Sequence, residues 1–135
     1  MVHIPDEIKE VFDRQRMIPL GTCSRDGTPN TIYIGSWWWI SPDTMLVVDN
    51  FFNKTRRNLD ENPRASLLTW SNEKKKSYQI KCSAIVKTNG PEYDQAFQRE
   101  RGRNDFYYPC KAVALLKVEE IYDAWYGEGA GKRLF

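Results

Sequence analysis

The chain has 135 residues, of which 41% are hydrophobic and 13% aromatic. A chain of this length and composition can bury one sizeable core, and we expect a single domain over residues 1–135. Twenty basic and eighteen acidic residues give a net charge of +2, and this near-balance argues against nucleic acid as the main partner.

Apolar periodicity and turn residues predict a mostly β protein with accessory helices. Helices are expected over residues 5–15 and 53–61, and a third begins at Pro91 and is broken at residue 102. Asp26-Gly27 is a strong hairpin signal between the first two strands. Short turns between consecutive strands favour antiparallel pairing, so we expect a six-stranded antiparallel β-barrel. The six expected strands are residues 17–24, 30–40, 45–49, 64–70, 78–88 and 112–121.

The cysteine and histidine content limits the chemistry. Cys23, Cys82 and Cys110 are widely separated, and His3 is the only histidine. A structural zinc site needs closely spaced ligands, so we expect no metal. The odd cysteine count and the lack of a signal peptide predict a cytoplasmic protein. No apolar stretch is long enough to cross a bilayer, so we expect no membrane partner.

The most informative segment follows the third expected strand. It reads Phe51-Phe52-Asn53-Lys54-Thr55 and opens the second expected helix. The free N–H groups and the dipole of a first helical turn favour an anion, and Lys54 and Thr55 add a charge and a hydroxyl donor. The preceding aromatic rings suggest a ligand with a flat body and a phosphate. The alternative is an ordinary helix start that is capped by Asn53.

Two neighbouring groups also have alternative interpretations. Arg56 and Arg57 either neutralise a phosphate or are solvated helix residues. On a strand, Trp37 and Trp39 share one face and Trp38 takes the other. We expect one face to lie in the core and the other at a dimer interface, with stacking on the ligand as the alternative.

Four segments occur in a recognisable order: residues 26–30 (DGTPN), 49–55 (DNFFNKT), 78–84 (YQIKCSA) and 112–118 (AVALLKV). In order and spacing they resemble the FMN-binding split barrel of the pyridoxamine 5′-phosphate oxidase-related proteins, in particular its small single-domain members. The resemblance implies that the expected barrel is a split β-barrel and that the protein is a homodimer.

The resemblance also implies two FMN sites at the subunit interface. The phosphate would lie at Lys54 and Thr55, and residues of the other subunit would cover the ring. Four backbone positions of the second strand would run beside the ring, and four residues before Lys54 would flank the ribityl chain. In chain order the implied cofactor-binding residues are Asn30, Thr31, Ile32, Tyr33, Asn50, Phe51, Phe52, Asn53, Lys54, Thr55, and, from the other subunit, Tyr107 and Tyr108.

The implied function is that of a flavoprotein, either an oxidoreductase or an electron carrier of unknown substrate. The longer oxidases of this family place arginine and histidine in the substrate site near the C-terminus. This chain has no histidine there, which argues against oxidation of a vitamin B6 phosphate. No side chain stands out as a general acid or base, so the catalytic residues stay unknown.

Two alternatives belong to other functional classes. One is a flavin-binding module that catalyses nothing. The other, less favoured, is a single-stranded nucleic-acid binder that uses exposed aromatic rings and Lys74–Lys76, residues that otherwise form a solvated loop.

Overall fold

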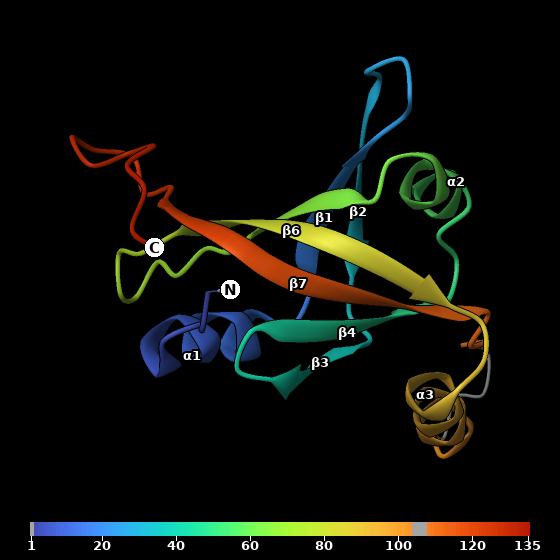
Figure 1. Ribbon diagram of the computed structural model, residues 1–135. Coiled ribbons are helices and arrows are strands. Elements are labelled where there is room, and N and C mark those ends of the chain that lie inside the picture. The colour runs from blue at the N-terminus through green and yellow to red at the C-terminus, as the bar shows by residue number, and fades with distance from the viewer. Residues whose placement is uncertain (1, 104–107) are drawn as a thin grey trace.

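The computed structural model describes residues 2–103 and 108–135. In chain order its elements are α1 (Asp6–Gln15), β1 (Ile18–Cys23), β2 (Pro29–Ile34), β3 (Trp37–Ser41), β4 (Thr44–Asp49), α2 (Lys54–Glu61), β5 (Arg64–Leu68), β6 (Tyr78–Lys87), α3 (Pro91–Arg101) and β7 (Ala112–Asp123). The strands pair antiparallel, which confirms the mostly β class with accessory helices (Figure 1). No described helix is long and apolar enough to span a bilayer.

The described sheet has seven strands, so the expected count of six was wrong. The strand expected over residues 30–40 is divided into β2 and β3 by Gly35 and Ser36. The sheet order is β2-β1-β5-β6-β7-β4-β3, so these two strands form opposite edges. The division occurs because the chain passes here from one edge to the other. At this corner the Ser36 carbonyl accepts a hydrogen bond from the N–H of Val48 at 2.9 Å.

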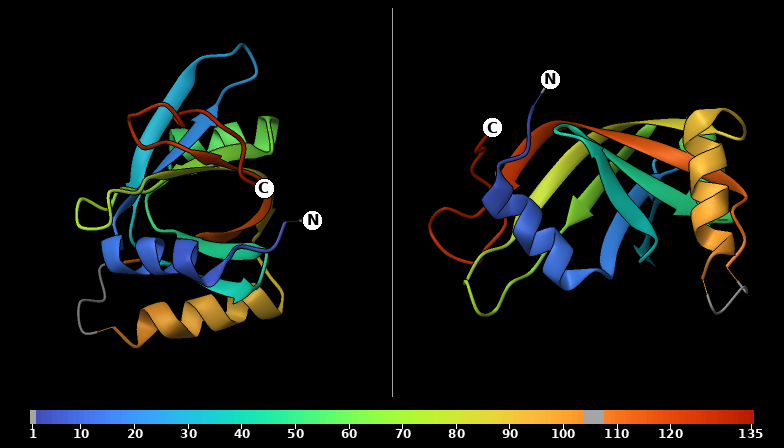
Figure 2. Two further views of the ribbon diagram at one scale, coloured as in Figure 1. Left: turned by 90° about the vertical axis from the view of Figure 1, so that its left-hand side faces the viewer. Right: turned by 90° about the horizontal axis from the view of Figure 1, so that it is seen from below.

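The two edges of the sheet are joined by only two residues, so they must lie close together. The sheet therefore curls into an open barrel, which Figure 2 shows from two further directions. β7 is central to this arrangement, because it pairs with β6 on one side and with β4 on the other.

Helix α1 closes part of the core. Ile8, Val11 and Phe12 are buried on its inner face. The Phe12 ring meets Trp37 and Trp39 edge to face, at centroid distances of 6.3 and 5.7 Å. Burial of side chains of this size contributes about 1.5–3 kcal/mol each. Two of the three consecutive tryptophans therefore serve the core, on the shared face that strand geometry predicts.

Helix α3 covers the outer side of β4 and β7. Ala96 belongs to a buried cluster with Leu46 and Val113, and Trp38 packs against that cluster. The Arg99 guanidinium carbon lies 4.0 Å from the centre of the Trp38 ring. The face on which we expected a second subunit is thus occupied by a helix of the same chain.

The loop between β5 and β6 is tied to α1. Lys74 Nζ lies 3.0 Å from Glu10 Oε2, and Arg14 Nη1 lies 3.4 Å from Glu73 Oε2. Lys74 is therefore half-buried and paired, whereas Lys75 and Lys76 are exposed as expected for a loop.

Candidate functional site

The turn that follows β4 is held by hydrogen bonds between its own residues. Asp49 is buried, and its Oδ1 accepts a hydrogen bond from the N–H of Phe52 at 3.0 Å. The N–H of Thr55 then donates to the Phe52 carbonyl at 3.0 Å. These bonds set the path of the chain from the strand into the first turn of α2, the segment in which an anion site was predicted.

Asn53 stands at the start of α2 in a strained conformation. Its φ is 51° and its ψ is −106°, a region that residues other than glycine rarely adopt. Such strain costs about 1–3 kcal/mol and is characteristic of ligand-binding positions. The Asn53 side chain is exposed and makes no capping hydrogen bond, so the structure does not support the alternative of an ordinary cap.

Thr55 lies beneath the surface. It is fully buried, and its Oγ1 accepts a hydrogen bond from Asn30 Nδ2 at 3.0 Å, which ties α2 to β2. A parallel bond from Asn58 Nδ2 to Thr22 Oγ1, at 3.1 Å, ties α2 to β1. Lys54, next to Thr55, is exposed. The structure therefore offers the Lys54 ammonium group directly to a ligand, and direct phosphate binding by the Thr55 hydroxyl stays a prediction.

An aromatic hollow of about 270 Å³ opens at the corner between β2 and β3. Four large apolar side chains around it are unusually exposed: Met17 (54%), Tyr33 (70%), Phe51 (58%) and Tyr108 (37%). Exposed apolar side chains that gather around a hollow mark a binding surface. The residues that define the aromatic hollow are Met17, Tyr33, Asn50, Phe51, Arg103 and Tyr108, with Ile32 and Phe52 also lining it.

A cationic hollow of about 420 Å³ lies beside α2 and the hairpin between β1 and β2. The two hollows are lined by nearby residues of the same segments. Strand β2 contributes Asn30 to the cationic hollow and Ile32 to the aromatic hollow. Similarly, Phe52 lines the aromatic hollow and Lys54 the cationic one. The residues that define the cationic hollow are Arg25, Asp26, Asn30, Lys54, Arg57 and Glu61.

The two neighbouring arginines of α2 have different surroundings. Arg56 Nη1 lies 3.3 Å from Asp49 Oδ2, and Arg56 Nε lies 3.6 Å from Asp60 Oδ2, so acidic partners compensate its charge. Arg57 is exposed and lines the cationic hollow together with Lys54. Of these two arginines, the structure therefore offers Arg57 to a phosphate.

Strand β2 is an edge strand whose described neighbour is β1 alone. Thr31 pairs with Gly21 of β1, and Tyr33 pairs with Pro19. The outward backbone groups of an edge strand have no ladder partner, so they can bond a ligand. The four predicted backbone positions, Asn30 to Tyr33, thus lie on a strand that has such groups to offer, although Thr31 lines neither hollow.

Tyr108 lines the aromatic hollow of its own chain, whereas the resemblance placed it over the ring of the other subunit. Arg103 lies over its ring, with the guanidinium carbon 4.3 Å from the ring centre, and also donates to Ser36 Oγ at 2.9 Å. Asn50 Nδ2 donates to the Pro109 carbonyl at 2.8 Å, which fixes the segment beside the turn. Tyr107 lies outside the described residues.

Two cysteines, Cys82 and Cys110, are not activated as nucleophiles. Burial, with Glu100 and Asp49 nearby, raises the pKa of Cys110 to about 11. Burial raises the pKa of Cys82 to about 12. Both thiols are therefore protonated near neutral pH and behave as small apolar side chains.

Several lining residues were not predicted from the sequence. Arg103 and Met17 reach the aromatic hollow from the segment after α3 and from the junction of α1 and β1, and no local pattern marks either of them. Glu61 could have been predicted as a lining residue, because it lies seven residues after Lys54 and therefore on the same face of the helix. Arg25 has no sequence signal of its own as a lining residue, except that it stands next to the predicted Asp26-Gly27 turn.

A family model described as pyridoxamine 5′-phosphate oxidase matches residues 4–123. The chain belongs to this family, which confirms the resemblance drawn from its sequence. The uncharacterized protein MJ0282 of Methanocaldococcus jannaschii is 29% identical to it over 134 residues, which cover 98% of this chain and 88% of the relative.

Solved structures share the fold. HupZ of Group A Streptococcus matches with a TM-score of 0.80 and 26% identity, over 95% of this chain and 99% of HupZ. An FMN-binding protein of Syntrophomonas wolfei matches with a TM-score of 0.63 and 20% identity, over 87% and 92% of the two chains. HutZ, the heme storage protein of Vibrio cholerae, matches with a TM-score of 0.66 and 18% identity, over 92% and 97%. At these last two identities the likeness concerns the fold alone.

Proposed function

We propose that the protein is a homodimeric FMN-binding flavoprotein that transfers electrons, as an oxidoreductase or an electron carrier. One observation carries the proposal: the aromatic hollow, lined by Phe52, and the cationic hollow, lined by Lys54, flank the strained residue Asn53. A molecule with a flat ring at one end and a phosphate at the other suits this arrangement. Membership of the family, and the name of the Syntrophomonas wolfei protein, make FMN the ligand of choice.

In this proposal the chain binds and orients the cofactor. Lys54 and Arg57 hold the phosphate by charge and hydrogen bonds. The outward backbone groups of β2 bond the polar edge of the ring, and Phe51 and Tyr108 cover its apolar parts. FMN, when bound, supplies the electron-transfer chemistry.

The second subunit completes the site in this proposal. Tyr33 and Phe51 are 70% and 58% exposed at the open side of the aromatic hollow. Two copies that meet there would bury these rings and exclude water from the flavin. Burial of aromatic side chains is a common source of interface energy.

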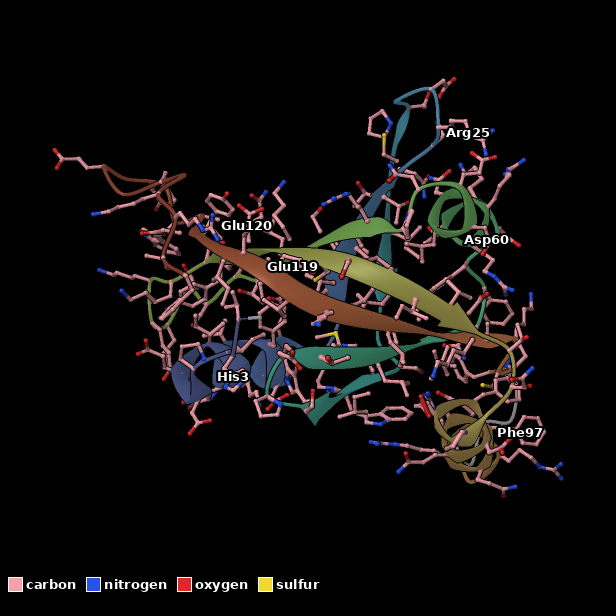
Figure 3. The ribbon with its side chains drawn as sticks, in the orientation of Figure 1. His3, Arg25, Asp60, Phe97, Glu119 and Glu120 are labelled. Atoms are coloured by element: carbon pink, nitrogen blue, oxygen red, sulfur yellow. The ribbon has the colours of Figure 1, made fainter. Side chains whose placement is uncertain are left out.

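Two other functions remain as alternatives. A flavin-binding module without a substrate needs the same two hollows and differs only in turnover. Heme storage, the role in the name of HutZ, is supported less well. The chain's only histidine, His3, lies beside α1 on the side away from Asp60 of α2 (Figure 3), and it lines neither hollow, so neither hollow presents the histidine ligand that many heme sites use.

The test is a titration of the purified protein with FMN, followed by light scattering. We expect flavin absorption bands that persist after gel filtration, FMN in the mass spectrum of the released cofactor, and a mass of two subunits. Catalysed oxidation of the reduced protein by added acceptors, faster than that of free FMN, would favour the enzyme over the binding module. A colourless monomer that does not bind FMN would exclude the proposal, and heme bands after titration with hemin would favour the HutZ-like alternative.

A further inference from the structure

The charge of the cationic hollow changes along its length. Helix α2 lines it with Lys54, Arg57, Asn58 and Glu61. These residues are spaced i, i+3, i+4 and i+7, so they share one face of the helix. The face is basic where the helix begins and acidic at its last residue. Because an α-helix rises 1.5 Å per residue, Glu61 lies about 10 Å beyond Lys54 along the axis.

The hairpin between β1 and β2 adds a second carboxylate at the acidic end. The N–H of Arg25 donates to Glu61 Oε2 at 3.4 Å, which brings the hairpin against the end of α2 (Figure 3). Asp26 accepts hydrogen bonds from the Ser24 hydroxyl and from the N–H of Thr28. These bonds hold the pKa of Asp26 below its usual value, so the group is charged at neutral pH.

The balance of charge suits one phosphate group. Arg25, Lys54 and Arg57 contribute three positive charges and Asp26 and Glu61 two negative ones, which leaves a formal charge of +1 around the hollow. The helix dipole adds positive potential at the Lys54 end and negative potential at the Glu61 end. A second anionic group placed beyond the phosphate would therefore meet two carboxylates, of which Arg25 offsets one, and the C-terminus of a helix.

We propose that Asp26 and Glu61 determine cofactor specificity, because they admit a flavin that ends in a phosphate monoester and disfavour one whose phosphate carries a further anionic substituent. This inference rests on the proposed function. Phe52 lines the aromatic hollow, whereas Lys54 and Glu61 both line the cationic hollow. In this inference, a group attached beyond the phosphate lies along α2 toward Glu61.

The experiment compares the affinities for FMN and FAD by isothermal titration. The variants are Glu61→Gln and the double variant Asp26→Asn with Glu61→Gln. Asparagine at position 26 keeps an Asn-Gly pair, which forms the same class of turn. The matched control is Asp13→Asn with Asp94→Asn, which removes two exposed carboxylates outside the hollow.

We expect the wild type to prefer FMN, and the ratio of the FAD to the FMN dissociation constant to fall about five- to tenfold in the double variant. Glu61→Gln alone should lower the ratio by a smaller factor, and the control should leave it unchanged. Raising the salt concentration to about 1 M should shrink the wild-type preference, because the charges are screened.

The inference and the proposed function fail in different ways. Tight FMN binding with an unchanged FAD-to-FMN ratio in the double variant would overturn the inference alone. An equal rise of the FMN and FAD affinities in the double variant would also overturn the inference, because it would show a general effect of charge instead of discrimination between the two flavins. A wild type that binds neither flavin would overturn the proposed function and this inference together.

Discussion

Asn53 and Lys54 are neighbours at the start of α2, and each contributes to the candidate site in its own way. Lys54 is exposed and offers a charge that can bond an anion. Asn53 contributes through its backbone conformation, because its positive φ turns the chain so that α2 begins directly after the aromatic pair Phe51 and Phe52. The charge of Lys54 was predictable from residue type, whereas the positive φ of Asn53 appears only in the structure.

Replacing Lys54 by alanine should weaken FMN binding about tenfold or more. A hydrogen bond to a charged group is worth about 1.5–3 kcal/mol, and the variant loses one such donor. The measurement is a fluorescence titration with FMN. Lys76→Ala is the matched control, because Lys76 is also exposed but lies in the loop between β5 and β6. Equal affinities of Lys54→Ala and wild type would place the phosphate elsewhere.

Replacing Asn53 by glycine should raise the stability of the protein without bound flavin. Glycine adopts the observed φ and ψ freely, so the variant loses strain of about 1–3 kcal/mol and incurs about 0.5–1 kcal/mol of extra chain entropy. Urea unfolding should therefore show a gain of about 1 kcal/mol. Asn72→Gly, at an exposed position with φ outside the positive region, should show no such gain. A loss of stability in Asn53→Gly would mean that the Asn53 side chain has a structural partner.

At the scale of elements, side-chain hydrogen bonds fix the turns and helices that frame the site. The bond from Asn30 to Thr55 holds α2 against β2. The Asp43 side chain holds the turn of the hairpin between β3 and β4. It is buried, and its Oδ1 accepts hydrogen bonds from Ser41 Oγ at 2.7 Å and Thr44 Oγ1 at 2.9 Å.

The Asp43 hairpin should make stability depend on pH. The Ser41 hydroxyl, more than any other group, holds the pKa of Asp43 below its usual value of 3.8. The folded state then favours the ionised form, so this stabilisation is present above about pH 4 and is lost as the pH falls through the folded pKa. Asp43→Asn should be less stable than wild type at neutral pH, and the difference should shrink at about pH 3.

Urea unfolding at both pH values measures the effect of Asp43→Asn. The control is Asp94→Asn, whose carboxyl group is exposed on α3. A difference between Asp43→Asn and wild type that stays constant with pH would assign the effect to packing instead of charge.

Most elements were predictable because periodicity and turn residues mark them locally. Asp26-Gly27 forms the turn between β1 and β2, and Pro91 opens α3, as expected. The division of β2 from β3 was not predictable, because the β-forming run from Asn30 to Ile40 hides a corner that only the closure of the sheet requires. The part of the candidate site around Lys54 could be predicted from a strand–turn–helix sequence. Arg103 could not, since tertiary packing alone brings it to the hollow.

At the scale of the molecule, the candidate site joins two parts of one curled sheet. The aromatic hollow lies where β2, at one edge, passes into β3, at the other. The cationic hollow lies between α2 and the hairpin of β1 and β2. A ligand that occupies both hollows should therefore stabilise the whole fold and not a single element.

FMN should raise the midpoint of thermal unfolding, and above the dissociation constant the rise should follow the logarithm of the FMN concentration. A ligand that binds only the folded state adds about 2.7 kcal/mol at one hundred times its dissociation constant. If two subunits complete each site, the midpoint should also rise with protein concentration. Differential scanning calorimetry over a range of both concentrations measures these effects, with riboflavin, which lacks the phosphate, as the control ligand. A midpoint that FMN and riboflavin shift equally would show that the cationic hollow takes no part in binding.

The central place of β7 has a consequence for biosynthesis. It is the last of the seven described strands to leave the ribosome, yet it lies between β6 and β4. Until β7 is added, β2-β1-β5-β6 and β4-β3 share no strand pairing, and the chain connects them through the corner at Gly35 and Ser36 and through α2. The nascent chain therefore lacks a continuous sheet until β7 has emerged, and for the proposed flavoprotein we expect cofactor binding to follow that step. If the cofactor is FMN, as proposed, cells that lack riboflavin should accumulate complete apoprotein chains and not stalled fragments.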